Sequence, residues 1–74
     1  MMTETYEAVE NAEGTITAAY FSRGMEGCYL DEWFGRPAAD FDRGMNGRGF
    51  AKQTTSEDRY RGTVKVHTYS RRVA

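Results

Sequence analysis

A ten-residue phrase that occurs twice is the feature that most constrains how this chain can fold. Residues 18–27 and residues 38–47 are identical at seven of ten positions, including the phenylalanine, the arginine, the methionine and two glycines. Two copies are fewer than the three or more that a stacked repeat protein needs to bury a continuous core. The sequence therefore predicts a local duplication inside one small domain over residues 1–74, because a chain this short builds only one core.

Each copy contains the pattern Phe-x-Arg-Gly-Met-x-Gly, in which the glycines can expose backbone N–H groups beside an arginine. A turn of that kind binds phosphate or carboxylate groups, and Arg23 and Arg43 would complete the two cradles. The simpler interpretation is that Phe and Met of each copy fill the core while the arginines are solvated. The pattern matches neither the dinucleotide fingerprint nor the Walker loop, so it predicts no cofactor.

The first half of the chain has the residue types of a β-hairpin. Residues 15–22 are rich in β-branched and aromatic residues and predict a strand that is broken at Gly24. Residues 3–10 alternate loosely, which favours a strand joined to the next one by a turn at residues 11–14. A helix over the same residues, ending at Gly14, stays open as an alternative, because apolar residues also recur there at helical spacing.

The second half is predicted to hold short helical segments followed by a second hairpin. Its elements are a helical turn around Leu30 and Phe34, a helix over 37–43 that ends at Gly44, strands over 50–55 and 59–71, and a turn at 56–58. The fold class that follows is α+β. We expect a small antiparallel sheet of about four strands, made of two hairpins, with a Gly-rich connection that carries one or two short helices.

The last predicted strand alternates, which assigns its side chains to two faces. Val64, Val66 and Thr68 are expected to face the core. The opposite face then carries basic and aromatic side chains, which are Lys65, His67, Tyr69 and Arg71. Such a face is typical of sheets that stack the bases of single-stranded nucleic acid and neutralise its phosphates, although a solvated outer face explains the same alternation.

Charge is distributed unevenly along the chain, although the net charge is only −1. Residues 1–35 carry seven acids and one base (net −6), whereas residues 36–74 carry nine bases and four acids (net +5). One interpretation is that the first and last strands lie side by side and neutralise each other. The other is that one half presents a charged face to a polyanion or to a basic groove.

The cysteine content and the N-terminal residues indicate the compartment. A single cysteine, Cys28, excludes an internal disulfide, and the first residues lack the basic and apolar regions of a secretory signal. We therefore expect a cytoplasmic protein, in the host cell if it is phage-encoded, without a membrane segment. Cys28 lies in an apolar run, so we expect a buried thiol and not a nucleophile activated by His67. One cysteine and one histidine exclude a structural zinc site within one chain, and no other metal or catalytic group is predicted.

Residues 19–31 resemble the opening strand and turn of the antirestriction proteins that mimic DNA. The resemblance is carried by Tyr20, Gly24 and Gly27, followed by Tyr29-Leu30-Asp31, with a glycine spacing one residue shorter here. DNA mimicry requires an acidic surplus, which this chain lacks. As a short chain rich in aromatic residues and glycine, it is also similar in type to phage-encoded inhibitors of bacterial defence, the anti-CRISPR proteins among them.

The first functional hypothesis is a non-enzymatic, stoichiometric binding protein, a phage or mobile-element inhibitor that occludes a host protein or ribonucleoprotein complex. Its anchors would be aromatic and arginine side chains, which dominate interface energies, with acids that compete for a basic groove. The candidate partner-binding residues are Arg23, Glu26, Tyr29, Asp31, Glu32, Trp33, Phe34, Arg43, Arg48, Tyr60 and Tyr69. The alternatives are the sheet-based nucleic-acid binder and a homodimeric accessory subunit that buries Trp33 and Phe34 against a second copy.

Overall fold

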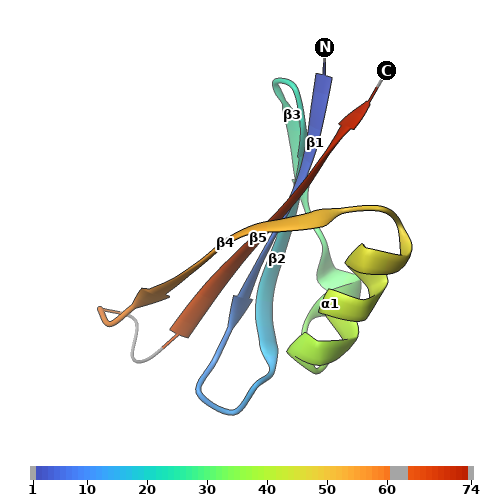
Figure 1. The fold of residues 1–74 in the computed structure, drawn as a ribbon. Coiled ribbons are helices and arrows are strands. Elements are labelled where there is room, and N and C mark those ends of the chain that lie inside the picture. The colour runs from blue at the N-terminus through green and yellow to red at the C-terminus, as the bar shows by residue number, and fades with distance from the viewer. Residues whose placement is uncertain (1, 61–63, 74) are drawn as a thin grey trace.

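The computed structural model describes residues 2–60 and 64–73, which form a five-stranded antiparallel sheet with one α-helix against one face (Figure 1). The neighbour order of the strands is β3-β2-β1-β5-β4. Along the chain the elements are β1 (Met2–Glu10), β2 (Ile16–Arg23), β3 (Glu26–Tyr29), the 3₁₀ turn η1 (Asp31–Trp33), α1 (Ala38–Gly47), β4 (Ala51–Asp58) and β5 (Val64–Val73). The expected α+β class is confirmed, but the sheet has five strands and not four.

Strand β1 lies at the centre of the sheet. It pairs with β2 on one side and with β5 on the other, so the first and last strands lie side by side. The strand interpretation of residues 3–10 is therefore correct, and the helical alternative is wrong. The pairing also places acids against bases, as expected if the two halves neutralise each other: Glu4 is opposite Arg71, and Glu10 is opposite Lys65.

The carboxylate of Glu4 is buried at the centre of this pairing, with only 3% of the residue exposed. Arg23 of β2 forms an ion pair with it and donates a hydrogen bond from Nε to Oε2 at 3.0 Å. Arg71 of β5 donates from Nε to Oε1 at 2.9 Å. These hydrogen bonds, first from Arg23 and then from Arg71, hold the pKa of Glu4 below its ordinary value. A buried carboxylate is tolerated only when it is paired in this way.

The fifth strand is β3, which the sequence did not predict. Gly24 adopts a positive φ of 58°, the chain reverses, and β3 then pairs with the end of β2. All four residues of β3 are exposed, so no burial pattern marks them as a strand. Cys28 is one of them, and the expectation that its thiol is buried is wrong. Strands β2 and β1 lie between Cys28 and His67.

Helix α1 is the second copy of the repeated phrase, and it extends beyond the predicted range of 37–43. Gly44 does not end it, because this glycine packs against Trp33: a Cβ there would lie 3.3 Å from the ring carbon Cη2. Phe41 and Met45 lie one helical turn apart and face the sheet. The ring of Phe41 contacts Trp33 at 4.8 Å and Tyr69 at 5.6 Å between centroids, which forms the centre of the core.

The first copy of the phrase has a different structure, because it forms the end of β2, the turn and the start of β3. Its arginine, Arg23, pairs with Glu4 across the sheet, whereas Arg43 pairs with Asp40 on the surface of α1. The two copies are therefore similar in sequence only. The hypothesis of two equivalent anion-binding cradles is wrong, since one of the supposed cradles is a helix.

The last hairpin is longer than predicted. Residues 56–58 continue β4 and pair with β5, so the predicted turn is wrong; residues 61–63, part of the predicted strand over 59–71, lie outside the described residues. The assignment of faces in β5 is also reversed. Tyr69 is buried against Phe41, while Val64, Val66 and Thr68 lie on the other face. Of these three, Val64 is nevertheless buried. A tyrosine ring buries more apolar area than a valine, and α1 covers the face that holds the rings.

The two methionines of the repeat provide a test of this fold. Met45 of α1 is fully buried, whereas its counterpart Met25 is fully exposed in the β2–β3 turn. We expect Met45→Ala to lower the free energy of unfolding by about 2–5 kcal/mol. Met25→Ala should change it by less than about 0.5 kcal/mol. Urea denaturation measures both, and equal losses would show that the second copy is not the core helix.

The buried Glu4 predicts a dependence of stability on pH. Its folded-state pKa is depressed from 4.5, so the carboxylate stabilises the fold above that value, and the contribution is lost as the pH falls through the lowered folded-state pKa. We expect the urea concentration at the unfolding midpoint of the wild type to fall as the pH is lowered below 4.5. Glu4→Gln should lower the midpoint at neutral pH and flatten the acid dependence. Glu13→Gln, at an exposed acid, is the control and should keep the wild-type profile.

Candidate interaction surface

The sheet face opposite α1, here called the open face, carries almost no charge. In an antiparallel sheet, directly paired residues lie on the same face, so the register identifies its members. Among the described residues, the charged ones on this face are Glu7 near its middle, Arg72 at one end and Asp58 at the end of β4. Its residues come from all five strands: Thr3, Thr5, Glu7, Val9, Ala18, Tyr20, Ser22, Gly27, Tyr29, Ala51, Thr54, Ser56, Asp58, Val64, Val66, Thr68, Ser70 and Arg72.

Two tyrosines form an aromatic pair on this face. Tyr20 of β2 is opposite Tyr29 of β3, and their rings meet edge to face with centroids 5.1 Å apart. They are 37% and 77% exposed, respectively. Tyr20 is also opposite Glu7 of β1, so an acid lies beside the pair. The three residues line a hollow of about 190 Å³.

Gly27 allows Tyr20 to lie along the sheet. A Cβ added at Gly27 would lie 2.6 Å from Cζ of Tyr20, well inside van der Waals contact. The second glycine of the first copy is therefore needed for the position of a side chain and not for a special backbone angle. At the equivalent position of the second copy, Gly47, a Cβ would meet nothing within 4 Å.

An acidic turn follows directly after β3. Asp31 and Glu32 begin η1, and Phe34 follows it; the side chains of all three are exposed. Glu26 is exposed at the opposite end of β3. We call these residues together with Tyr29 the β3 side. It combines exposed aromatic rings with three carboxylates at one edge of the sheet, a composition that suits a basic protein surface.

The structure brings together some of the residues predicted to bind a partner and excludes others. Five of the eleven form the β3 side. Trp33 and Tyr69 are buried in the core, so predicting them as exposed anchors is wrong. Arg23 lies beside the β3 side, opposite Glu26, but its guanidinium is paired with Glu4. The remaining three lie elsewhere: Arg43 on α1, Arg48 just after α1, and Tyr60 after β4 at the other edge of the sheet.

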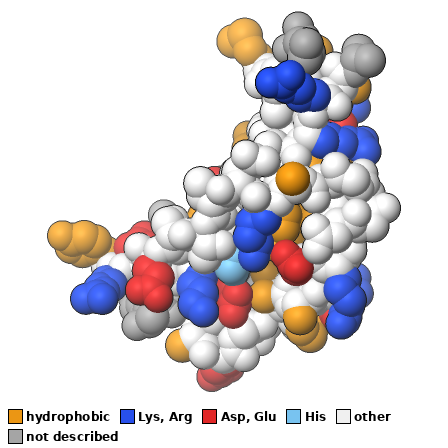
Figure 2. Space-filling model, viewed as in Figure 1, with side chains coloured by type: hydrophobic (Ala, Val, Ile, Leu, Met, Phe, Trp, Pro, Cys, Tyr) orange, Lys and Arg blue, Asp and Glu red, His pale blue; other side chains and the backbone are white. Residues whose placement is uncertain are grey.

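The face covered by α1 carries a network of polar side chains at its margin. Tyr69 donates its hydroxyl hydrogen bond to Oδ1 of Asp42 at 2.7 Å. This bond lowers the pKa of the Asp42 carboxyl, while burial, and then the same bond, raises the pKa of Tyr69. Nζ of Lys52 lies 3.5 Å from Oδ1 of Asp42, and Nε2 of His67 lies 2.7 Å from Oε1 of Glu10. Figure 2 shows the histidine between basic and acidic side chains on this face.

These partners change the interpretation of the basic and aromatic residues of β5. The proposed nucleic-acid face needs Tyr69 and His67 free to stack and Arg71 free to neutralise phosphate. Instead, Tyr69 is buried, His67 is paired with Glu10, and Arg71 is paired with Glu4 while its Nη1 also donates to the carbonyl of Arg48 at 2.8 Å. The face on which the nucleic-acid hypothesis rested is therefore occupied by contacts within the chain.

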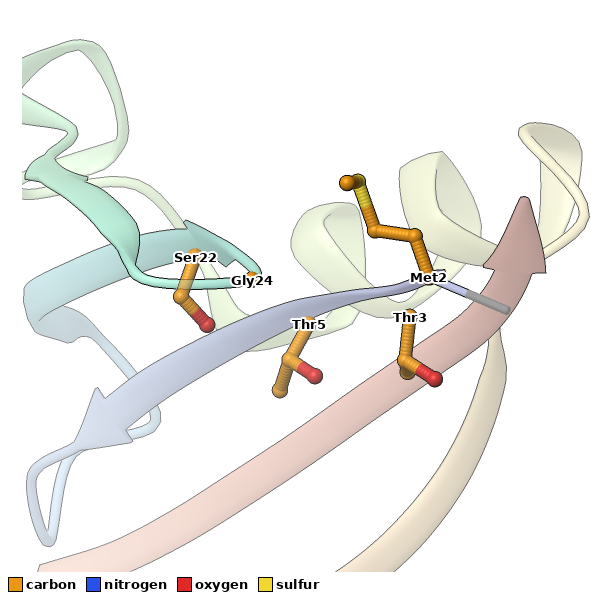
Figure 3. Close-up of a pocket in the computed structure, with 5 residues that line it drawn as sticks. All are labelled: Met2, Thr3, Thr5, Ser22 and Gly24. Carbon is orange, nitrogen blue, oxygen red and sulfur yellow. The ribbon is translucent and has the colours of Figure 1, made fainter. Parts of the chain in front are cut away.

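A second hollow of about 530 Å³ lies at the end of the open face near the start of β1. Its lining includes the hydroxyls of Thr3, Thr5 and Ser22, which point to the same side of the sheet, while Met2 points to the other (Figure 3). Gly24 completes the lining. The hollow contains no charged side chain and is wide open, so it gives little basis for assigning a ligand.

Comparison of the chain with protein-family models, with curated proteins and with solved structures found no match. In the described part of the chain, no helix is long and apolar enough to cross a membrane. The function must therefore be argued from the surface itself.

Sequence reasoning missed two residues of this surface, Glu7 and Tyr20. Both lie on strands that were predicted correctly, so the signal was present in the alternation of those strands. Tyr20 and Glu7 become neighbours only through the register of β1 and β2, and the bulge between Val9 and Glu10 shifts that register near the turn. A turn at 11–14 alone does not specify such a bulge.

The paired glycines of the repeat give a test of the aromatic pair. We expect Gly27→Ala to displace the Tyr20 ring, because the new methyl group occupies its place. The ring-current shifts and nuclear Overhauser contacts between Tyr20 and Tyr29 should then be lost. Gly47→Ala should leave those signals unchanged and raise helix stability by up to about 1 kcal/mol. Unaltered tyrosine signals in Gly27→Ala would contradict the geometry described for this surface.

Proposed function

We propose that the chain is a non-enzymatic, stoichiometric binding protein, an inhibitor of the phage or mobile-element type that occludes a host protein or ribonucleoprotein complex through its β3 side. The observation that carries the proposal is the combination of exposed Tyr29 and Phe34 with the unpaired acids of η1 at one sheet edge. Tyrosine rings bury large areas at little entropic cost, and acids steer association with a basic surface.

The arrangement of charge supports this assignment. Several bases are paired with acids outside the β3 side: Arg23 and Arg71 with Glu4, Arg43 with Asp40, and Lys52 with Asp42. Two bases lie beside this surface, since Arg23 is opposite Glu26 and Arg36 lies over Trp33 of η1. Within residues 2–60 and 64–73, the carboxylates of Glu26, Asp31 and Glu32 have no ion-pair partner. An acidic surface that is not neutralised by its own chain can compete with nucleic acid for a basic groove.

The two alternatives have less support. The nucleic-acid hypothesis relied on the face of β5 that is now buried or paired. The homodimer hypothesis relied on a joint patch of Trp33 and Phe34, but Trp33 is covered by Phe41 and Arg36 within the chain. Phe34 alone then remains exposed, and one ring is a small fraction of a stable dimer interface.

The test begins with affinity purification of the full chain from the cells that encode it, followed by mass spectrometry of the co-eluting protein. Against that partner we expect the double charge reversal Asp31→Lys and Glu32→Lys to weaken binding at least about tenfold at low salt. The salt dependence of the affinity should also become flatter. The matched control is Glu13→Lys with Glu57→Lys, which makes the same change of net charge at exposed sites in the β1–β2 turn and on β4.

Unchanged affinity and salt dependence in the Asp31 and Glu32 variant would remove the acidic mechanism. An equal loss in the control would show a general effect of net charge and would contradict a specific surface. Tyr29→Ser tests the aromatic part separately, because it removes an exposed ring without changing the charge.

A further inference from the structure

Glu7 differs from the other acids of β1 in having no hydrogen-bond or ion-pair partner among the described residues. On the same strand, Glu4 is paired with Arg23 and Arg71, and Glu10 is paired with His67. These two point to the face that α1 covers, whereas Glu7 lies on the open face between β2 and β5. In the part of the chain that the structure describes, its carboxylate makes neither a hydrogen bond nor an ion pair. A carboxylate at the centre of a sheet face gains most from a cation that arrives from outside.

The tyrosine pair beside Glu7 also lacks a cation. Each of three other rings is covered by one from its own chain: Trp33 by Arg36 at 4.6 Å, Phe50 by Arg71 at 4.5 Å and Tyr69 by Lys52 at 5.4 Å. Over residues 2–60 and 64–73, no arginine or lysine lies over Tyr20 or Tyr29. Arg72, the base on the open face among the described residues, is opposite Thr3, four positions along β1 from Glu7.

The shape of the hollow matches one kind of side chain. Its lining combines Glu7, the tyrosines Tyr20 and Tyr29, and the apolar residues Val9 and Ala18; Ala19 also borders it, although its side chain faces the core. An arginine has the three complementary parts. Its guanidinium donates two parallel hydrogen bonds to a carboxylate, its plane stacks on an aromatic ring, and its methylene stem packs on apolar groups. A lysine ammonium is more strongly hydrated and has no plane to stack.

We infer that the hollow between Glu7 and the Tyr20–Tyr29 pair receives an arginine side chain from the partner protein. The inference rests on the proposed function, since it names the group that the binding surface recognises. It extends the β3 side inward to β1, so that docking would place the partner's backbone along the β3 edge and its arginine over the open face. The acids of η1 would then attract the basic surface that carries this arginine.

The test uses two short peptides, blocked Gly-Arg-Gly and blocked Gly-citrulline-Gly, which differ only in the charge of a side chain of the same shape. We expect titration with the arginine peptide, followed by NMR of the full chain, to shift the signals of Glu7, Tyr20 and Tyr29 and few others. The citrulline peptide should bind about tenfold more weakly, because it lacks the charge-assisted hydrogen bonds. Glu7→Gln should reduce the affinity for the arginine peptide by a similar factor. Because Glu7 is exposed, this substitution should leave the fold intact.

Glu57→Gln is the matched control, because it makes the same change of charge at an exposed acid on the opposite edge strand. Equal losses in the two variants, equal binding of the two peptides, or shifts that do not centre on the hollow would each overturn the inference. Concentration-dependent dimerisation that Glu7→Gln or Arg72→Gln abolishes would also overturn it, because a second copy would then supply the arginine.

The result is separable from that of the proposed function. A partner that depends on Asp31 and Glu32 but binds Glu7→Gln with wild-type affinity leaves the proposed function standing and removes the arginine site. A chain that binds the arginine peptide at the hollow but co-purifies with no protein would keep the arginine site and remove the proposed function.

Discussion

The fold depends on a single buried carboxylate. Glu4 accepts hydrogen bonds from Arg23 on one neighbouring strand and from Arg71 on the other, so one side chain joins the three central strands. The two arginines together offset the cost of burying the charge, and both reach Glu4 because β1 lies between β2 and β5. The opposite charges of the two halves of the sequence thereby select a topology in which the first and last strands are adjacent. Register is specified as well, because a shift of one residue would move Glu4 to the open face.

The repeated phrase shows how far local sequence is overruled by its surroundings. Seven identical positions form a strand and a hairpin turn in one copy and a complete helix in the other. Two of the three differing positions are Tyr20 and Ser22 in the strand, and Asp40 and Asp42 in the helix. Tyrosine favours a strand, whereas aspartate is disfavoured there and suits the first turns of a helix. Tertiary contacts also stabilise the helix in the second copy, since Asp42 accepts a hydrogen bond from the hydroxyl of Tyr69 and Met45 packs in the core.

The sequence was sufficient for the elements that have a strong local pattern and insufficient for those fixed by tertiary contact. The first two strands, the helix and the strand β4 were predicted near their observed positions. The strand β3 was not, because four exposed residues have no hydrophobic period and pair only where Gly24 turns the chain. The faces of β5 were reversed because valine and tyrosine alternate there, and only the position of Phe41 decides which of them is covered. At the candidate surface, Tyr29, Asp31, Glu32 and Phe34 were identified from residue type, whereas Glu7 and Tyr20 required the register.

The charge pairing that joins the central strands also makes the two faces of the sheet differ in charge. Glu4, Glu10 and Asp42 neutralise bases on the face covered by α1, so the charges of that face satisfy one another. Four of the acids without an ion pair in the described residues lie on η1, on β3 or at Glu7 of β1, whereas Glu13 lies in the β1–β2 turn and Glu57 on β4. A net charge of −1 hides this separation. A basic surface that approaches the β3 edge meets the acids of η1 and Glu26 beside exposed aromatic rings, with Glu7 on the adjoining open face. The proposed docking through the β3 edge uses the acids without ion pairs that lie beside exposed aromatic rings, so the charge pairing of the sheet would set the orientation of the partner.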